Sequence, residues 1–102
     1  MSSASGAVSI AHEERGHRGA FVVDRDGARL AEMTYTRAGA DLVIIDHTDV
    51  SDALRGQGVG QQLVEAAVGW ARETGVKLLP LCPFARSVFD RHAELHDVLA
   101  PP

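Results

Sequence analysis

The sequence predicts an α+β fold with a mixed β-sheet, in which an antiparallel meander precedes a helix, a parallel strand and a second helix. Two observations predict it. Apolar segments separated by short turns fill the chain up to residue 50. Apolar residues at helical spacing then begin near Val59, and another apolar run follows beyond Gly75. A helical crossover joins two strands of the same direction, so the strands before and after this helix are expected to be parallel.

The antiparallel part is expected to contain four strands. Their predicted positions are residues 7–12, 20–23, 29–37 and 42–50. An Asp-Gly turn in residues 24–27 and a glycine-containing turn in residues 38–41 separate the later strands. The last of these segments is apolar and β-branched, which is typical of a strand.

The apolar spacing becomes helical after residue 58. One face of the expected helix carries Val59, Leu63, Ala66, Ala67 and Trp70. Gly75 stands where a helix is expected to end. The apolar run of residues 76–81 is then expected to form the parallel strand, with an irregular end because Pro80 cannot donate a backbone hydrogen bond.

A second helix is expected to begin at Pro83, because proline suits the first helical position. Its inward-facing residues are predicted to be Phe84, Val88 and Phe89. The helix is expected to fray near residues 92–95.

The composition fits one globular domain. The chain has 102 residues, of which 45% are apolar and 24% are charged. We expect a single domain over residues 7–99, between a disordered tail at residues 1–6 and a short tail at residues 100–102. The formal charge of −4, without a basic stripe, argues against nucleic acid as a partner.

Membrane insertion and secretion are not expected. The chain has no run of about 18 apolar residues, as a transmembrane helix would need. The first six residues lack the basic end and apolar stretch of a signal peptide. Cys82 is the single cysteine, which excludes an internal disulfide framework. We therefore expect a cytoplasmic protein.

The most informative segment for function is Arg55-Gly56-Gln57-Gly58-Val59-Gly60, between the expected central strand and the first helix. Glycines allow a tight turn, and the free N–H groups of a first helical turn bind anions, so the segment predicts a phosphate or pyrophosphate site. A Walker loop would need a lysine, and none occurs before Lys77. A dinucleotide fingerprint would need another glycine spacing in the first strand-to-helix turn.

The pattern Arg55-x-x-Gly58-x-Gly60 resembles the acyl-coenzyme A signature of the GNAT acyltransferase superfamily. Three further blocks, His47-Thr48-x-Val50, Leu81-Cys82-Pro83-Phe84 and Arg91-His92, resemble a compact branch of predicted GNAT acetyltransferases. The resemblance covers residues 21–99 and implies that acetyl-coenzyme A is the acyl donor.

The resemblance also implies roles for individual residues. Val50 would end the strand whose backbone pairs with the pantetheine arm. Backbone amides of the turn would bind the pyrophosphate, at Gln57, Gly58, Val59, Gly60 and Gln61. Arg55 would add a charge contact. An amine would attack the acyl carbonyl directly, and no metal or prosthetic group would be required.

The chain departs from the larger family in two ways. In the larger family, N-terminal helices usually form a wall of the acceptor site. This chain has no room for them, because strands are expected within the first 20 residues. The tyrosine that often acts as a general acid after the last parallel strand is missing, since Tyr35 is the only tyrosine and lies early in the chain. A homodimer is one way to supply the missing wall.

Two residues are candidates for catalysis. His47 lies near the end of the central strand and could accept a proton at neutral pH, or it could be a structural histidine. Cys82 precedes Pro83, so the helix N-terminus would lower the pKa of its thiol and favour the thiolate. Cys82 could act as a nucleophile that carries the acetyl group, or as the acid that protonates the departing coenzyme A thiolate. Alternatively, Cys82 has no catalytic role and packs in the core as a small apolar residue. His92 and His96 are four residues apart, but no third ligand completes a metal site.

These observations support two functions from different classes. The first is an acetyltransferase that moves an acetyl group from acetyl-coenzyme A to an amine of a small molecule, peptide or protein. The second is a non-catalytic coenzyme A-binding module or sensor, which would need the glycine turn but neither His47 nor Cys82.

Overall fold

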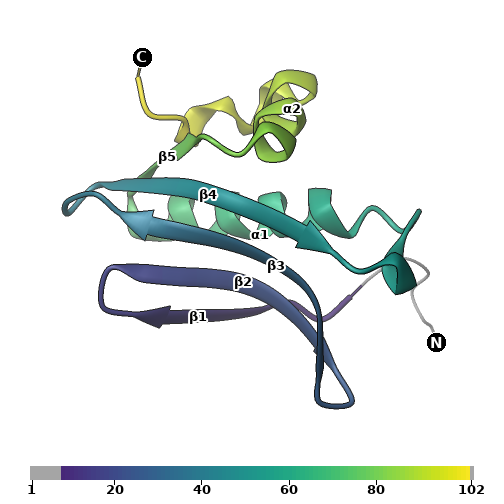
Figure 1. Cartoon of the computed structure of the whole chain (residues 1–102). Coiled ribbons are helices and arrows are strands. Elements are labelled where there is room, and N and C mark those ends of the chain that lie inside the picture. The colour runs from purple at the N-terminus through teal and green to yellow at the C-terminus, as the bar shows by residue number, and fades with distance from the viewer. Residues whose placement is uncertain (1–7, 102) are drawn as a thin grey trace.

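The computed structural model describes residues 8–101, which form a five-stranded sheet in the order β1-β2-β3-β4-β5 (Figure 1). The strands are β1 (Ala11–Arg15), β2 (Arg18–Arg25), β3 (Ala28–Arg37), β4 (Leu42–Val50) and β5 (Lys77–Pro80). The helices are α1 (Val59–Thr74) and α2 (Pro83–Arg91), with short 3₁₀ helices η1 (Asp52–Leu54) and η2 (Ala93–Val98). Neighbours from β1 to β4 are antiparallel, and β5 is parallel to β4, as the sequence predicted.

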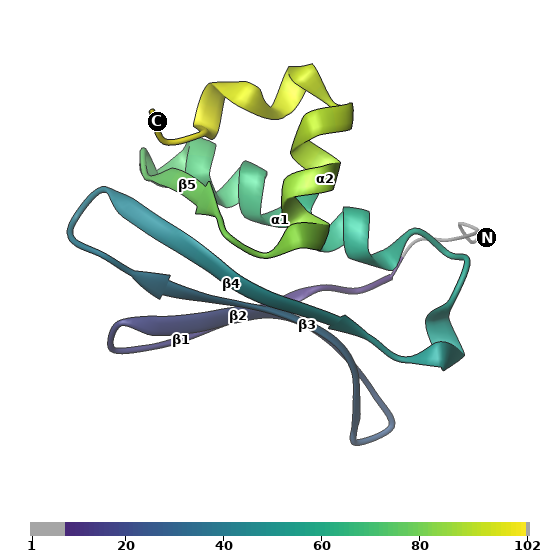
Figure 2. The ribbon, with the colours of Figure 1, turned by 45° about the horizontal axis from the view of Figure 1, so that its top comes forward.

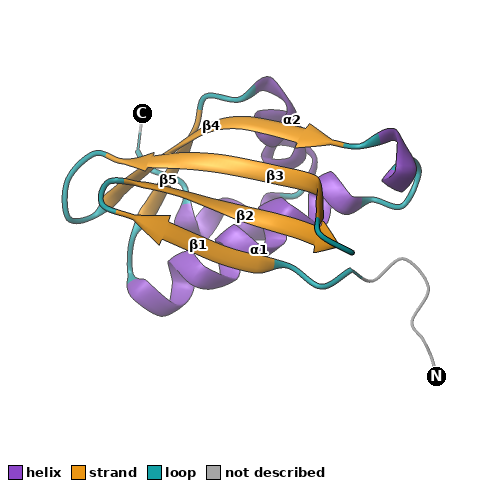
Figure 3. Ribbon diagram, turned by 60° about the horizontal axis from the view of Figure 1, so that its bottom comes forward, coloured by secondary structure: helices purple, strands orange, loops and turns teal. Residues whose placement is uncertain are grey.

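Both α-helices lie on one face of the sheet, and within the described chain no helix covers the opposite, open face (Figures 2 and 3). The core between the two layers includes Tyr35, Ile45, Leu63, Leu78 and Phe89, each at most 2% exposed. Trp70 is half-buried against this core, in agreement with its predicted place on the inner face of α1. None of the described helices is long and apolar enough to cross a membrane.

Three local predictions were wrong. The first strand is Ala11–Arg15 rather than residues 7–12, and all its residues are exposed, so its sequence has no apolar alternation to identify it. The chain does not fray after α2 but continues into η2. Phe84 does not pack into the core, because its side chain lies at the surface beside α1. The predicted tail at residues 1–6 lies outside the described residues.

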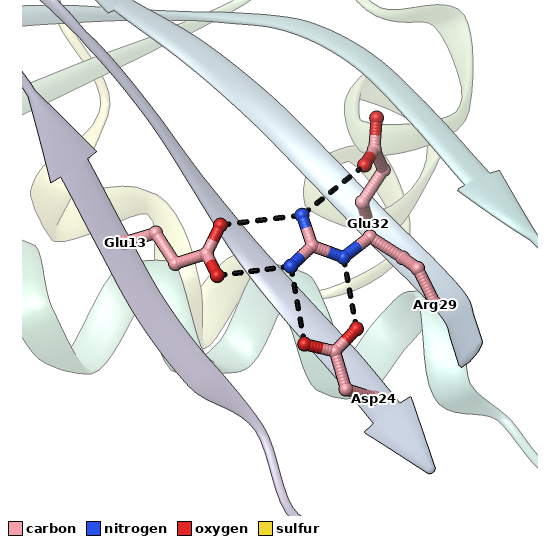
Figure 4. Close-up of polar contacts among 4 residues, drawn as sticks. All are labelled: Glu13, Asp24, Arg29 and Glu32. Carbon is pink, nitrogen blue, oxygen red and sulfur yellow. Dashed lines mark hydrogen bonds and ion pairs between the residues drawn. The ribbon is translucent and has the colours of Figure 1, made fainter. Parts of the chain in front are cut away.

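Edge strand β1 is held on the open face by an ion-pair network around Arg29 of β3 (Figure 4). The guanidinium lies 2.9 Å from Glu13 of β1, 2.9 Å from Asp24 of β2 and 3.7 Å from Glu32 of β3. Hydrogen bonds from Arg29 lower the pKa of Asp24. All four side chains are well exposed, so the network contributes little to the stability of the fold.

An aromatic cluster holds β1 on the helix side of the sheet. His12 of β1 stacks on Phe21 of β2 with ring centroids 4.3 Å apart, and it meets the edge of Trp70 of α1 at 4.9 Å. Tyr35 of β3 stacks on Trp70 at 5.3 Å. The cluster therefore joins three strands to the second half of α1.

Polar contacts complete this cluster. Tyr35 Oη lies 2.6 Å from His12 Nε2 and donates a hydrogen bond of 2.8 Å to Glu14. Arg37 donates to the same carboxylate at 2.6 Å and places its guanidinium 5.2 Å from the Trp70 ring centroid. Burial, followed by the hydrogen bond to Glu14, raises the pKa of Tyr35. The phenol therefore stays protonated and can donate to Glu14.

This cluster predicts a loss of stability in mild acid. Burial lowers the pKa of His12 and outweighs the opposing charge of Glu14, while the charge of Arg37 adds to the lowering. The folded state therefore prefers neutral His12 and binds fewer protons than the unfolded state, whose histidine pKa is about 6.5. The stabilising contribution is present above that value and is lost as pH falls towards the folded-state pKa.

The measurement is the free energy of unfolding in urea between pH 7.5 and pH 5 for the wild type and for His12→Gln, which keeps a hydrogen-bonding group but cannot titrate. The wild type should lose more stability across this range than the variant. Parallel pH curves would contradict the role given to His12. Below about pH 4.5 both proteins should weaken further, because the Arg37 hydrogen bond lowers the pKa of Glu14.

Candidate functional site

Strands β4 and β5 separate halfway along β4. Their register runs from Leu42 opposite Lys77 to Ile45 opposite Pro80 and then stops. The N–H groups of Leu81 and Cys82 both donate to Ile45 O, at 3.1 and 3.2 Å, which ends the pairing. Within the described chain, residues 46–50 of β4 therefore have no strand on this side. Their backbone can pair with an extended ligand.

A glycine turn and a helix start follow the end of β4. Gly56 and Gly58 have φ values of +80° and +69°, a conformation that favours glycine. Gly58 is the N-cap of α1, and no side chain of residues 8–101 donates or accepts a capping hydrogen bond there. The first helical hydrogen bond runs from Gln62 N–H to Gly58 O at 3.1 Å. The preceding N–H groups of α1 have no partner within the helix and can bind an anion.

The turn lines a cavity of about 350 Å³ between the end of β4, the first turn of α1 and α2. Of the seven predicted cofactor-binding residues, six line it: Val50, Arg55, Gly58, Val59, Gly60 and Gln61. The seventh, Gln57, is not part of the wall, and its N–H already donates to Leu54 O at 3.3 Å.

Two cavity residues on α2, Phe84 and Arg91, were not among the predicted site residues. The Phe84 ring lies over Gly60, where an added Cβ would stand 2.5 Å from the ring, and 40% of the residue is exposed. The spacing of Phe84 and Val88 predicts a shared inward face, but the missing side chain of Gly60 makes room for the ring outside the core. No local sequence rule shows that Gly60 and Phe84 face each other, because the contact joins two helices that are far apart in the chain.

The two predicted catalytic residues lie on opposite sides of β4. His47 is exposed and pairs with Thr34 of β3. The next residue, Thr48, faces the helices, where its hydroxyl lies 3.4 Å from the sulfur of Cys82. Successive strand residues point to opposite faces, so His47 points towards the open face of the sheet. The imidazole and the thiol therefore do not form a nucleophile–base pair.

Cys82 is the N-cap of α2, directly before Pro83 at the first helical position, and is 5% exposed. Burial of the thiol acts to raise its pKa. The Thr48 hydroxyl and the backbone N–H groups of Ala85, Phe84 and Thr48 act in the opposite direction, and together they leave the pKa below its ordinary value. The environment therefore favours the thiolate at a position with little access to solvent.

The pair of histidines after α2 has other partners. His92 Nδ1 lies 3.3 Å from Glu94, and His96 Nε2 lies 2.6 Å from the carbonyl oxygen of Phe89. Among the described residues, no three histidine, cysteine, aspartate or glutamate side chains are grouped as metal ligands. The contact of His96 therefore joins η2 to α2, whereas His92 contacts a residue of η2.

A model of the GCN5-related N-acetyltransferase family matches residues 20–98 of the chain. Protein NATD1 of Homo sapiens is 32% identical over 76 residues, which are 74% of this chain and 66% of the human protein. A GCN5-like protein from Staphylococcus aureus is 34% identical, with a TM-score of 0.69 over 90% of this chain and 89% of its own.

The structure of AAC(6')-Iy in complex with the bisubstrate analog CoA-S-monomethyl-acetylneamine shares the fold at 18% identity, with a TM-score of 0.51 over 79% of this chain and 62% of its own. The mixed sheet, the divergence of β4 from β5 and the glycine turn agree with the family match. The chain belongs to the GCN5-related N-acetyltransferase family.

Proposed function

We propose that the protein transfers an acetyl group from acetyl-coenzyme A to an amine. The observation that carries the proposal is the cavity at the start of α1, which adjoins the half of β4 that does not pair with β5. The positions where Cβ atoms at Gly56 and Gly58 would stand are open, with no atom within 4 Å, so the backbone can approach a pyrophosphate closely. The complex of AAC(6')-Iy with a CoA analog supports this choice of ligand.

Different parts of the site are proposed to bind different parts of acetyl-coenzyme A. The N–H groups of Val59, Gly60 and Gln61 bind the pyrophosphate at the positive end of α1. The backbone of residues 46–50 pairs with the pantetheine arm, and Val50 forms the apolar wall where this strand meets the cavity. When bound, acetyl-coenzyme A supplies a thioester whose acetyl group an amine can take.

Proton transfer is proposed for the two candidate residues. His47 opens onto the free face of the sheet, where an amine can approach, and its imidazole can accept the proton that the amine loses. Cys82 lies on the other side of β4 and can return a proton to the departing coenzyme A thiolate. As an alternative, its thiolate accepts the acetyl group before the amine does.

A non-catalytic coenzyme A-binding module is the second candidate. It is favoured by the placement of His47 and Cys82 on opposite sides of β4 and by the low exposure of Cys82. No described helix covers the open face of the sheet, so an acceptor can approach this face. A peptide or protein amine therefore suits this face as well as a small molecule.

The experiment combines calorimetric titration of coenzyme A and acetyl-coenzyme A with a turnover assay on a panel of amines. We expect saturable binding by the wild type and turnover of at least one amine. His47→Gln or Cys82→Ser should reduce turnover about 100-fold, the range seen for a general acid or base, without weakening binding. Binding without turnover of any amine would favour the module. Folded protein that does not bind either compound would exclude both functions.

A further inference from the structure

Two arginines, Arg55 and Arg91, line the cavity at the start of α1, and they differ in whether a carboxylate pairs with them. Arg55 lies 2.5 Å from the carboxylate of Asp52, which lines the same cavity, and its side chain is 78% exposed. Within the described chain, Arg91 has neither a hydrogen bond nor an ion pair from its side chain. Only one of the two guanidinium groups is therefore available to a ligand without breaking an existing contact.

The charges of the cavity wall also favour Arg91 as the residue that binds an anion. Its charged side chains are Asp52, Arg55 and Arg91. The pair between Asp52 and Arg55 is neutral as a unit, so Arg91 supplies the net positive charge of the wall. A diphosphate that enters the cavity meets the uncapped N–H groups of α1 and this guanidinium, and an arginine can bind phosphate oxygens with two parallel hydrogen bonds.

The geometry of α2 explains why Arg91 reaches the cavity. Phe84 and Arg91 are seven residues apart, so they lie on the same face of α2, about two turns from each other. Both line the cavity, whereas Arg86 lines a different hollow beside Leu79 and Leu99. The basic end of α2 thus lies across the cavity from the start of α1.

We propose that Arg91 binds the pyrophosphate of coenzyme A, and that Arg55 serves mainly to neutralise Asp52. The inference rests on the proposed coenzyme A site and assigns its charged contact to a residue of α2 instead of the glycine turn. It predicts that affinity depends on Arg91 itself and on the neutrality of the Asp52–Arg55 pair, rather than on Arg55 alone.

The test is calorimetric titration of coenzyme A and dephospho-coenzyme A, which lacks the 3′-phosphate. Arg91→Gln should weaken the binding of both compounds by about tenfold, the effect of one charge-assisted contact. The double variant Asp52→Asn/Arg55→Gln removes the pair together and should bind within about twofold of the wild type. Arg86→Gln, on the same helix but outside the cavity, is the matched control and should bind as the wild type does.

Three results would overturn the assignment. Unchanged affinity of Arg91→Gln for both compounds would remove Arg91 from the site. A loss confined to coenzyme A would place Arg91 at the 3′-phosphate instead. A larger loss in the double variant than in Arg91→Gln would return the charged contact to Arg55. Failure of the folded wild type to bind either compound is a separate outcome, because it removes the coenzyme A site itself and the proposed function with it.

Discussion

Replacement of Gly58 by glutamate is expected to abolish coenzyme A binding while the protein keeps its fold. Gly58 caps α1 with a φ of +69°, and no atom lies within 4 Å of the position that its Cβ would occupy. The larger residue therefore costs mainly left-handed backbone strain, about 1–2 kcal/mol. Its carboxylate would stand beside the free N–H groups that are proposed to bind the pyrophosphate, would compete for them and would repel the phosphates. We expect affinity to fall more than about 100-fold in calorimetric titration.

Gly16→Glu is the matched control for this variant. Gly16 lies in the turn between β1 and β2, has a φ of +61° and also has no atom within 4 Å of its Cβ position. Gly16→Glu carries the same added charge and similar backbone strain, but it lies outside the cavity. It should lose comparable stability and bind coenzyme A normally. If both variants lose binding, general destabilisation explains the result, and normal binding by Gly58→Glu would exclude the glycine turn as the pyrophosphate site.

The part of this structure that the sequence predicts best is the part specified by local rules. Helix α1 begins at Val59 and ends at Thr74, and Gly75 adopts a φ of +82° at its C-cap, as expected from glycine at a helix end. The turn before α1 was predicted because its glycines are needed for positive φ values, which two of them have. These features depend on a few consecutive residues, so they can be recognised without knowing the tertiary structure.

Features that depend on contacts between distant segments were not predictable. All of β1 is exposed, so its register is fixed by pairing with β2 and by contacts such as His12 with Tyr35. The opposed positions of His47 and Cys82 follow from the register of β4 and from the place where β5 leaves it. Arg91 joins the cavity only because α2 packs across the start of α1. The sequence identifies candidate residues with suitable chemistry, but it does not show which of them line the same cavity.

Phe89→Ala is expected to cause the largest loss of stability among the single changes considered. Phe89 is 1% exposed and packs in the core shared by the sheet and both α-helices. Removing a buried phenylalanine side chain costs about 3–5 kcal/mol, from lost burial and from the cavity that remains. Small domains are stable by about 5–15 kcal/mol, so this variant should unfold at a much lower urea concentration than the wild type.

Phe84→Ala is the matched control, because it removes the same side chain from the same helix at a position that is 40% exposed. Its loss of stability should be below about 1.5 kcal/mol, since surface positions contribute little burial. The Phe84 ring lines the cavity, so this variant should instead change the affinity for coenzyme A. The two variants therefore separate the two roles of α2: Phe89 holds the helix in the core, and Phe84 faces the ligand. Equal losses of stability in the two variants would contradict this division and would place Phe84 in the core, as its sequence position had suggested.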